Sequence, residues 1–199
     1  GQGLVFNSGL GIGKGAETVN AVERVFNGLR PYTSVVEGGF LRGAAATYEL
    51  SKQLSTTAFF SSLRQDASLR AINDSALVFS SFQRTGLHRT ANEIARKRRV
   101  NEALVGFNVT YRMNNLNLVG LTFQTSQFSA DINRGAHPIN RFEFTGDRNT
   151  NVSFYGNQQL KQFRFFGEVS LSANRSLGAL MGVSGKLDPR LEVVLLLRD

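Results

Sequence analysis

The sequence predicts an all-β fold, an antiparallel up-and-down transmembrane β-barrel. Stretches of strict apolar–polar alternation recur along the 199 residues, as in strands that have one apolar face. Their polar positions carry Asn, Ser, Thr, Gln and Gly with isolated charges, whereas a face in bulk water normally carries many Lys and Glu. The connections between the stretches are either very short or long. Tight turns on one rim and long loops on the other are typical of outer-membrane barrels.

Three strands are expected in the first third of the chain. Gly3–Gly13 is rich in glycine, Phe40–Leu50 has small residues at its centre, and Leu54–Arg64 is rich in Thr, Ser and Phe, which strands favour. The first two are separated by a long loop near residues 14–39, in which Ala16–Phe26 is a possible short helix. Ser51 to Gln53 form a tight turn between the second and third strands.

The longest connection covers residues 66–100. It contains the run SALVFSSFQ, which predicts a local strand, followed by a helical stretch around His88–Arg96. Thr90 can cap that helix, and Glu93 three residues later completes the pattern of a capping box.

Regular alternation resumes at Glu102–Met113, and after a turn at Asn114–Asn115 the partner strand is expected over Leu116–Ala130. A long loop near 131–148 follows. Four more strands are then expected, beginning at Asn149, Phe163, Leu177 and Leu191, with short breaks at Lys161–Gln162, Asn174–Ser176 and Leu187–Arg190.

These elements make about nine strands, within a range of 8–10. Alternate connections of a meander lie on the same rim, so the tight turns gather on one rim and the long loops on the other, with Asn174–Ser176 as the short exception. Bacterial single-chain barrels have even strand numbers, and both chain ends lie in strand-like patterns. We therefore expect residues 1–199 to be a single segment of a larger barrel.

Six polar residues are predicted to face the lumen, together with Gly106, because they share the polar side of their strands: Asn108, Thr110, Arg112, Arg164, Glu168 and Ser170.

The amino-acid composition excludes several classes of function and structure. The chain has no Cys, which excludes disulfides and thiolate chemistry, and no apolar run of 18 residues, which excludes a transmembrane helix. The net charge is +8 and the pI is about 10.4, so an anionic lipid surface or nucleic acid has to be considered. The densest basic region also includes His88 and is read as a solvated loop, as a contact for anionic headgroups, or as a site for an anionic partner: Arg84, Arg89, Arg96, Lys97, Arg98 and Arg99.

Catalytic and metal chemistry find little support. The segment Gly9–Gly15 resembles a phosphate loop, but Gly15 stands where a Walker motif requires Ser or Thr after its Gly-Lys. A rim hydrolase would need residues such as Ser81, His88 and Asn92 to meet, which spacing alone does not indicate. The two histidines give no transition-metal site, and three loosely clustered carboxylates match no calcium loop: Asp131, Glu143 and Asp147. We expect no enzyme activity, metal or cofactor.

Six aromatic residues lie near expected strand ends and are candidates for interfacial girdles: Phe40, Tyr48, Phe128, Phe142, Phe144 and Tyr155.

Four stretches carry a resemblance to a known family: RPYTSVVEGGFLRGAAATYEL, TGLHRTANEIARKRRVNEALVGFNVTYR, NRFEFTGDRNTNVSFYG and FGEVSLSANRSLGALMGVSG. They resemble the membrane-barrel portion of a family of Bacteroidota envelope proteins that often carries helix-hairpin-helix repeats before the barrel. The resemblance implies a bacterial outer-membrane location, with outer-membrane lipid or lipopolysaccharide and other envelope proteins as partners. No helix-hairpin-helix segment is present, so nucleic acid is not supported as a partner.

The expected function is therefore that of a non-enzymatic outer-membrane barrel in transport or pore formation, envelope assembly or partner scaffolding. Two alternatives stay open. The first is a soluble β-sandwich or lipocalin-like binding module, whose apolar faces would enclose a core. The second is a barrel-rim hydrolase.

Overall fold

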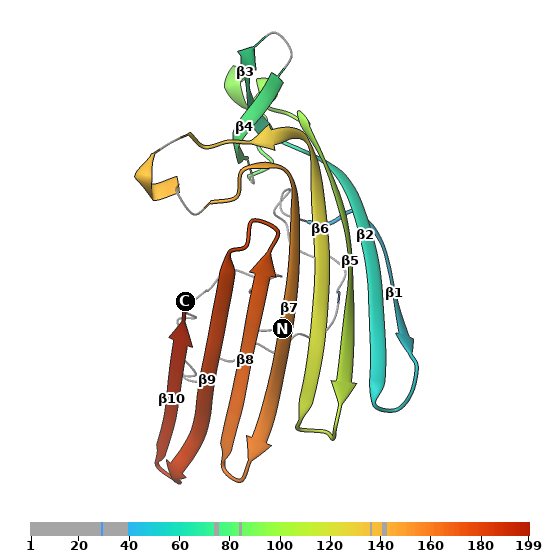
Figure 1. Cartoon of the computed structure of the whole chain (residues 1–199). Coiled ribbons are helices and arrows are strands. Elements are labelled where there is room, and N and C mark those ends of the chain that lie inside the picture. Colours follow the sequence, from blue (N-terminus) through green and yellow to red (C-terminus); the bar gives the residue numbers. More distant parts are fainter. Residues whose placement is uncertain (1–28, 30–39, 74–75, 84, 136, 141–142) are drawn as a thin grey trace.

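The computed structural model of the chain describes residues 29, 40–73, 76–83, 85–135, 137–140 and 143–199. In this part the chain forms ten strands, eight of which follow one another in one antiparallel up-and-down sheet in the order β1-β2-β5-β6-β7-β8-β9-β10 (Figure 1). The predicted all-β meander is confirmed at this level. The strands of the meander are β1 (Gly43–Glu49), β2 (Leu54–Gln65), β5 (Val100–Arg112), β6 (Leu118–Ile132), β7 (Gly146–Leu160), β8 (Phe163–Ser172), β9 (Leu177–Asp188) and β10 (Leu191–Arg198).

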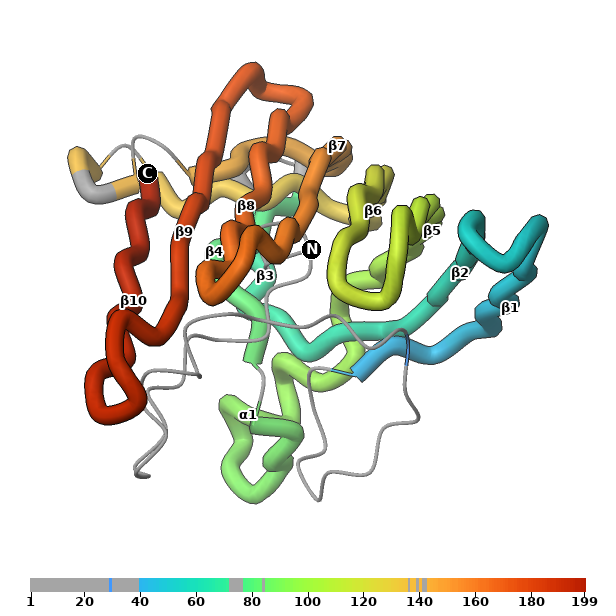
Figure 2. Tube along the Cα trace, turned by 90° about the horizontal axis from the view of Figure 1, so that it is seen from below, coloured from blue at the N-terminus to red at the C-terminus, as the bar shows by residue number. Residues whose placement is uncertain are grey.

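The sheet curves into an open arc, with β1 and β10 at its two ends (Figure 2). Among the described residues β1 pairs only with β2 and β10 only with β9, so these strands do not close a barrel. The expected strand Gly3–Gly13, the possible helix Ala16–Phe26 and most of the loop near 14–39 lie outside the described residues.

The turns lie as predicted. Ser51 Oγ accepts hydrogen bonds from the backbone N–H groups of Gln53 (3.2 Å) and Leu54 (3.0 Å) in the β1–β2 turn. Asn114 Oδ1 accepts from Leu116 N (2.9 Å) and Asn117 N (2.8 Å) in the β5–β6 turn. Side-chain acceptors of this kind replace the missing ladder partners of a tight turn. These turns share one rim, while the connections 66–99 and 133–145 lie on the opposite rim (Figure 1). We call the latter the loop rim.

Several strand boundaries differ from the prediction by two to three residues. β1 begins at Gly43 where Phe40 was expected, β5 begins at Val100 where Glu102 was expected, and β9 ends at Asp188, inside the expected break Leu187–Arg190. β6 covers Leu118–Ile132 where Leu116–Ala130 was expected, and β7 begins at Gly146 where Asn149 was expected. The β7 ladder extends because Arg148 pairs directly with Gln127 of β6. The prediction missed this strand end because the charged residues Asp147 and Arg148 interrupt the apolar–polar alternation on which it was based.

The loop rim carries its own small fold. β3 (Ala67–Asn73) and β4 (Ala76–Phe82) form a hairpin, and β4 makes a short parallel pair with the end of β6. The predicted helix is confirmed as α1 (Ala91–Ala95), with the Thr90 N-cap and both hydrogen bonds of the capping box.

A buried apolar cluster anchors the hairpin to the sheet. It consists of Ala67, Phe79, Val100, Phe128 and Ala130, against which Phe82 and Phe144 also pack. The ring of Phe79 lies 4.8 Å from that of Phe82 and 5.9 Å from that of Phe128, centroid to centroid, within the range of favourable aromatic pairs. The girdle interpretation is therefore wrong for Phe128, which belongs to this cluster.

Four aromatic side chains of the sheet lie over a glycine of the neighbouring strand. The pairs are Phe59 over Gly106, Tyr155 over Gly120, Phe163 over Gly185 and Phe166 over Gly182, and each is a direct cross-strand pair. A Cβ atom built on any of these glycines would come within about 2.5 Å of the opposing ring, far inside van der Waals contact. The ring occupies the volume that a second side chain would take.

Replacing Gly120 by alanine tests this packing. The added methyl group collides with the Tyr155 ring (2.3 Å to Cζ), so we expect the free energy of unfolding to fall by about 1–3 kcal/mol, as in other overpacked sites. The control is Gly178→Ala, also in a strand, whose added Cβ has no atom within 4 Å; it should change stability by less than about 0.5 kcal/mol. Equal denaturation midpoints for the two variants in a urea titration would show that the ring does not need the glycine.

Candidate functional site

The two faces of the sheet differ in chemistry and in burial. One face, defined here as the polar face, contains the buried polar residues Ser61, Asn108, Thr122, Ser153 and Glu168, which lie on five neighbouring strands. In a single curved sheet the side chains converge on the concave side and spread apart on the convex side. The buried polar face is therefore the inner face of the arc in Figure 2.

The structure places all six predicted lumen candidates on the polar face, as the strand registers show. Asn108 and Glu168 are buried, at 6% and 3% exposure. Thr110, Arg164 and Ser170 are half-buried, and Arg112 is exposed at the tight-turn end of β5. The six residues are thus brought to one surface, where Asn108 and Thr110 are joined to each other by a hydrogen bond.

The centre of the polar face is a hydrogen-bond network across β5, β6 and β7. Asn108 Nδ2 donates to Thr122 Oγ1 (2.9 Å) and to Tyr155 Oη (2.8 Å). Thr110 Oγ1 donates to Asn108 Oδ1 (2.9 Å) and lies 2.8 Å from Tyr155 Oη. A buried amide is costly unless it is hydrogen-bonded, and here both of its polar atoms are engaged.

Tyr155 was misjudged from the sequence as a girdle residue. It lies within β7 at 5% exposure and belongs to the polar face. The sequence did contain a sign of this position, because Tyr155 has the same parity as Ser153 and Asn157 and therefore lies on the polar side of its strand. Phe166 is a second aromatic residue on this face, at 4% exposure over Gly182.

The opposite face, defined here as the apolar face, is exposed. Phe107 is 40%, Phe154 57% and Phe165 46% exposed, although all three are large aromatic side chains. Val109 and Val193 on the same face are half-exposed. No second layer of the described residues covers these side chains, which is the reverse of a soluble β-sandwich.

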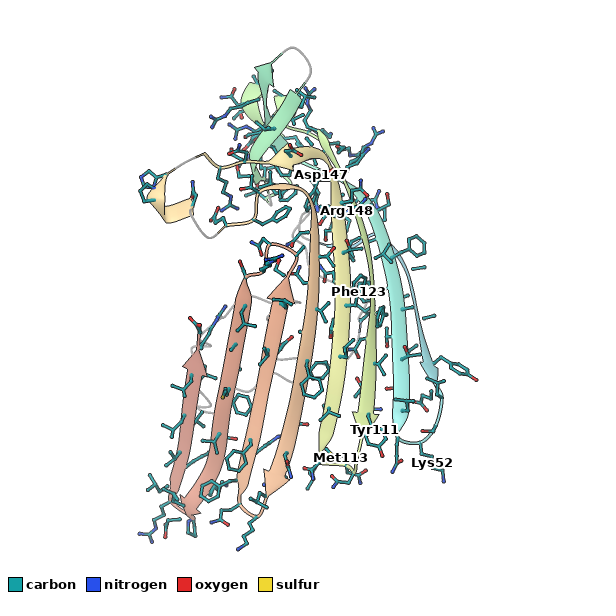
Figure 3. The ribbon with its side chains drawn as sticks, in the orientation of Figure 1. Lys52, Tyr111, Met113, Phe123, Asp147 and Arg148 are labelled. Carbon is teal, nitrogen blue, oxygen red and sulfur yellow. The ribbon has the colours of Figure 1, made fainter. Side chains whose placement is uncertain are left out.

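The strand registers give the apolar face an order. One row across the sheet reads Ala58, Phe107, Phe123, Val152, Leu171 and Leu177, each residue paired with the next. Figure 3 shows Phe123 in the middle of β6, with Lys52 at the tight-turn rim and Asp147 and Arg148 at the loop rim. Charged residues therefore bracket an apolar band.

The loop rim is held together by Asp66, which lies between β2 and β3. Its Oδ2 lies 2.6 Å from His88 Nε2, and its Oδ1 accepts a hydrogen bond of 2.7 Å from Arg98 N. Its backbone oxygen accepts from Gln83 N at 2.8 Å. A single residue, through its carboxylate and its backbone oxygen, thus joins both ends of the connection 83–99 to the end of β2.

The predicted basic residues of this connection are spread over its surface. Arg89 lies 3.7 Å from Glu93 in an i,i+4 pair, and Arg96 caps the end of α1. Lys97, Arg98 and Arg99 are exposed, and Arg84 lies outside the described residues. The backbone N–H group of Arg89, followed by that of Thr90, lowers the pKa of the Glu93 carboxyl, so the capping box is formed at neutral pH and weakens as the pH falls through that lowered pKa.

The structure does not assemble the other candidate sites. His88 is bonded to Asp66, and no hydrogen bond between the described side chains joins it to Ser81 or Asn92. Glu143 pairs with Arg134 at 2.7 Å, and the described residues contain no cluster of three potential metal ligands. Tyr48 is exposed at the tight-turn end of β1, whereas Phe142 lies outside the described residues.

Comparison with protein-family models and with curated proteins found no match for this chain. Within the described residues, no helix has both the length and the apolar character needed to cross a membrane.

Removing the Tyr155 hydroxyl tests the network. Tyr155→Phe leaves Asn108 and Thr110 without their shared partner, and we expect a loss of about 1–3 kcal/mol in the free energy of unfolding. Tyr111→Phe is the control, because its hydroxyl makes one exposed hydrogen bond of 3.4 Å to Gln53 and should contribute less than about 0.5 kcal/mol. Similar losses for both variants in urea titrations would contradict a cooperative buried network.

Removing the Asp66 carboxylate tests the rim junction. Asp66→Ala breaks the contacts with His88 and Arg98 N, so the connection 83–99 should open more often and trypsin should cut after Arg96 to Arg99 several times faster. Asp147→Ala removes an exposed carboxylate at the same rim and should leave the cleavage rate unchanged. Equal rates in Asp66→Ala and the parent chain would show that the junction does not hold the connection.

Proposed function

We propose that this chain is part of the wall of an integral outer-membrane β-barrel that acts without catalysis, in transport, envelope assembly or the scaffolding of a partner. The observation that carries the proposal is the inverted burial of the sheet, whose polar face is buried while its apolar face is exposed. In water that arrangement is unfavourable, because each exposed Phe, Leu or Val forgoes about 1.5–3 kcal/mol of burial. In a bilayer the hydrocarbon covers the apolar face and the penalty disappears.

The extent of the apolar face supports lipid as its cover. Exposed apolar side chains occur on all eight strands of the meander and form one surface, unlike the scattered apolar residues of a soluble monomer. Along β7, the stretch from Thr150 to Leu160 rises about 33 Å, and at a tilt of about 40° it crosses about 25 Å. That is the height of the apolar band on outer-membrane barrels.

The polar face supports a wet interior. Its amides and hydroxyls are hydrogen-bonded to one another around Asn108, as expected of a wall that faces water or a polar solute. A soluble binding module would instead need a second layer over the apolar face. Among the three roles, holding or passing a polar solute uses this face most directly.

The two open edges of the sheet require further strands if the sheet lies in a membrane. Unpaired strand edges are not tolerated in hydrocarbon, so further strands complete the wall beyond β1 and β10, such as the strand expected over Gly3–Gly13 or those of a larger barrel. The resemblance of the chain to Bacteroidota envelope barrels is in keeping with this assignment, as are outer-membrane lipid and other envelope proteins as partners.

Two neighbouring phenylalanines of β8 test which face meets lipid. Phe165 lies on the apolar face and Phe166 on the polar face, at nearly the same depth. The chain has no Trp, so Phe165→Trp and Phe166→Trp each introduce a single fluorophore. In vesicles of phosphatidylcholine with brominated acyl chains, we expect strong quenching of the Trp at position 165 and little at position 166.

The same pair separates the alternatives. A folded, detergent-free monomer in which neither Trp is quenched would overturn the membrane assignment and favour a soluble module. Equal quenching at both positions would show that lipid reaches both faces, which contradicts a wall with a polar interior. Circular dichroism of each variant shows that the sheet has formed.

A further inference from the structure

A cavity of about 720 Å³ lies at the loop rim, where β2, β5 and β6 meet the connection 83–99. The charged side chains that line it are Arg42, Arg64, Arg98 and Asp66. Neutral donors complete the lining, among them Ser62, Gln65, Gln83, Asn101 and Gln127. The cavity therefore combines an excess of positive charge with many hydrogen-bond donors.

The one carboxylate of the lining is already engaged. Both oxygens of Asp66 are bound, one by His88 and one by the backbone N–H group of Arg98. None of the ion pairs formed among the described residues involves the side chain of Arg42, Arg64 or Arg98. Three guanidinium groups thus border one cavity without a carboxylate partner, which is the arrangement of an anion site.

The strand registers place this cavity relative to the apolar band. Ser62, Ala103 and Gln127 form a row across β2, β5 and β6, and the backbone of Arg42 joins the same row through Ser62 N. The next row toward the tight-turn rim begins with the exposed Phe60 and Val105. Because side chains two residues apart share a face, the cavity opens on the apolar face directly beyond the apolar band.

We propose that this cavity binds the phosphate group of an anionic lipid headgroup, an inference that rests on the membrane assignment made above. Immediately beyond the hydrocarbon is where a headgroup phosphate lies, and basic pockets in this position hold anionic headgroups. Arg64 belongs to β2, and Arg42 directly precedes β1 and is held to β2 by the bond from Ser62 N to its backbone oxygen. Both supply planar donors that match phosphate oxygens. Arg98 closes the site from the connection 83–99, whose position Asp66 fixes.

The test uses the full chain carrying Phe165→Trp in dodecylmaltoside micelles at 150 mM salt, titrated with phosphatidic acid and followed by native mass spectrometry. Arg42→Gln/Arg64→Gln should weaken phosphatidic acid binding at least about tenfold, since hydrogen bonds to a charged group are lost. Arg175→Gln/Arg190→Gln removes the same charge from two turns outside the cavity and should leave the affinity unchanged. Arg98→Gln tests the site separately if the double variant folds poorly.

Each other outcome has a definite meaning. Equal weakening by the control pair would show diffuse attraction by net charge and overturn the site. Inorganic phosphate that competes at the same concentration as phosphatidic acid would assign the cavity to a soluble phosphate and overturn the lipid source. Quenching of the Trp at position 165 by brominated phosphatidylcholine reports membrane insertion independently of the headgroup, so a failed headgroup site and a failed membrane assignment give different results.

Discussion

A sheet of one layer has two faces, and both must be matched to a solvent. This constraint governs the structure more than any single contact, because the meander has no second sheet or helical layer among the described residues to cover either face. At its centre the polar face is satisfied by side-chain hydrogen bonds such as those of Asn108 and Tyr155, whereas Gln124 Oε1, Ser153 Oγ and Asn157 Oδ1 are buried there without a partner among the described residues. The apolar face is covered by no other described part of the chain and contacts the surrounding medium directly. The stability of the fold therefore depends on whether that medium is water or hydrocarbon.

The loop rim meets a different constraint and uses a different means. There the chain leaves the sheet, and the connection 83–99 needs anchors of its own. The Phe79–Phe128 cluster supplies apolar burial, and Asp66 supplies three polar contacts at one point. The rim is therefore a small, separately anchored fold attached to the sheet, and arginines of the sheet and of the loop border one cavity there.

Most of the sheet was predictable from the sequence, because strand periodicity is a local property. The alternation along Glu102–Met113 and the Thr90–Glu93 capping pattern each act over a few residues and were confirmed. For the site, the sequence predicted on which face of the sheet the residues lie, but not which side chains contact one another. That Tyr155 bonds Asn108, or that Asp66 meets His88, depends on register and on a loop path across 22 or more residues, which local patterns do not encode. Aromatic residues such as Phe128 misled for the same reason, since a position near a strand end does not say what the ring touches.

The aromatic rings that lie over glycines make pairs of positions interdependent. The space above Gly106 belongs to Phe59, and the space above Gly182 belongs to Phe166. A larger residue in place of either glycine is tolerated only when the opposing aromatic residue is replaced by a smaller one. The reason is that the close packing between the curved strands leaves a fixed volume for the two side chains together. Among homologous chains we therefore expect the two positions of each pair to covary in side-chain volume. A larger residue at one position should go with a smaller residue at the other, so that their summed volume stays constant.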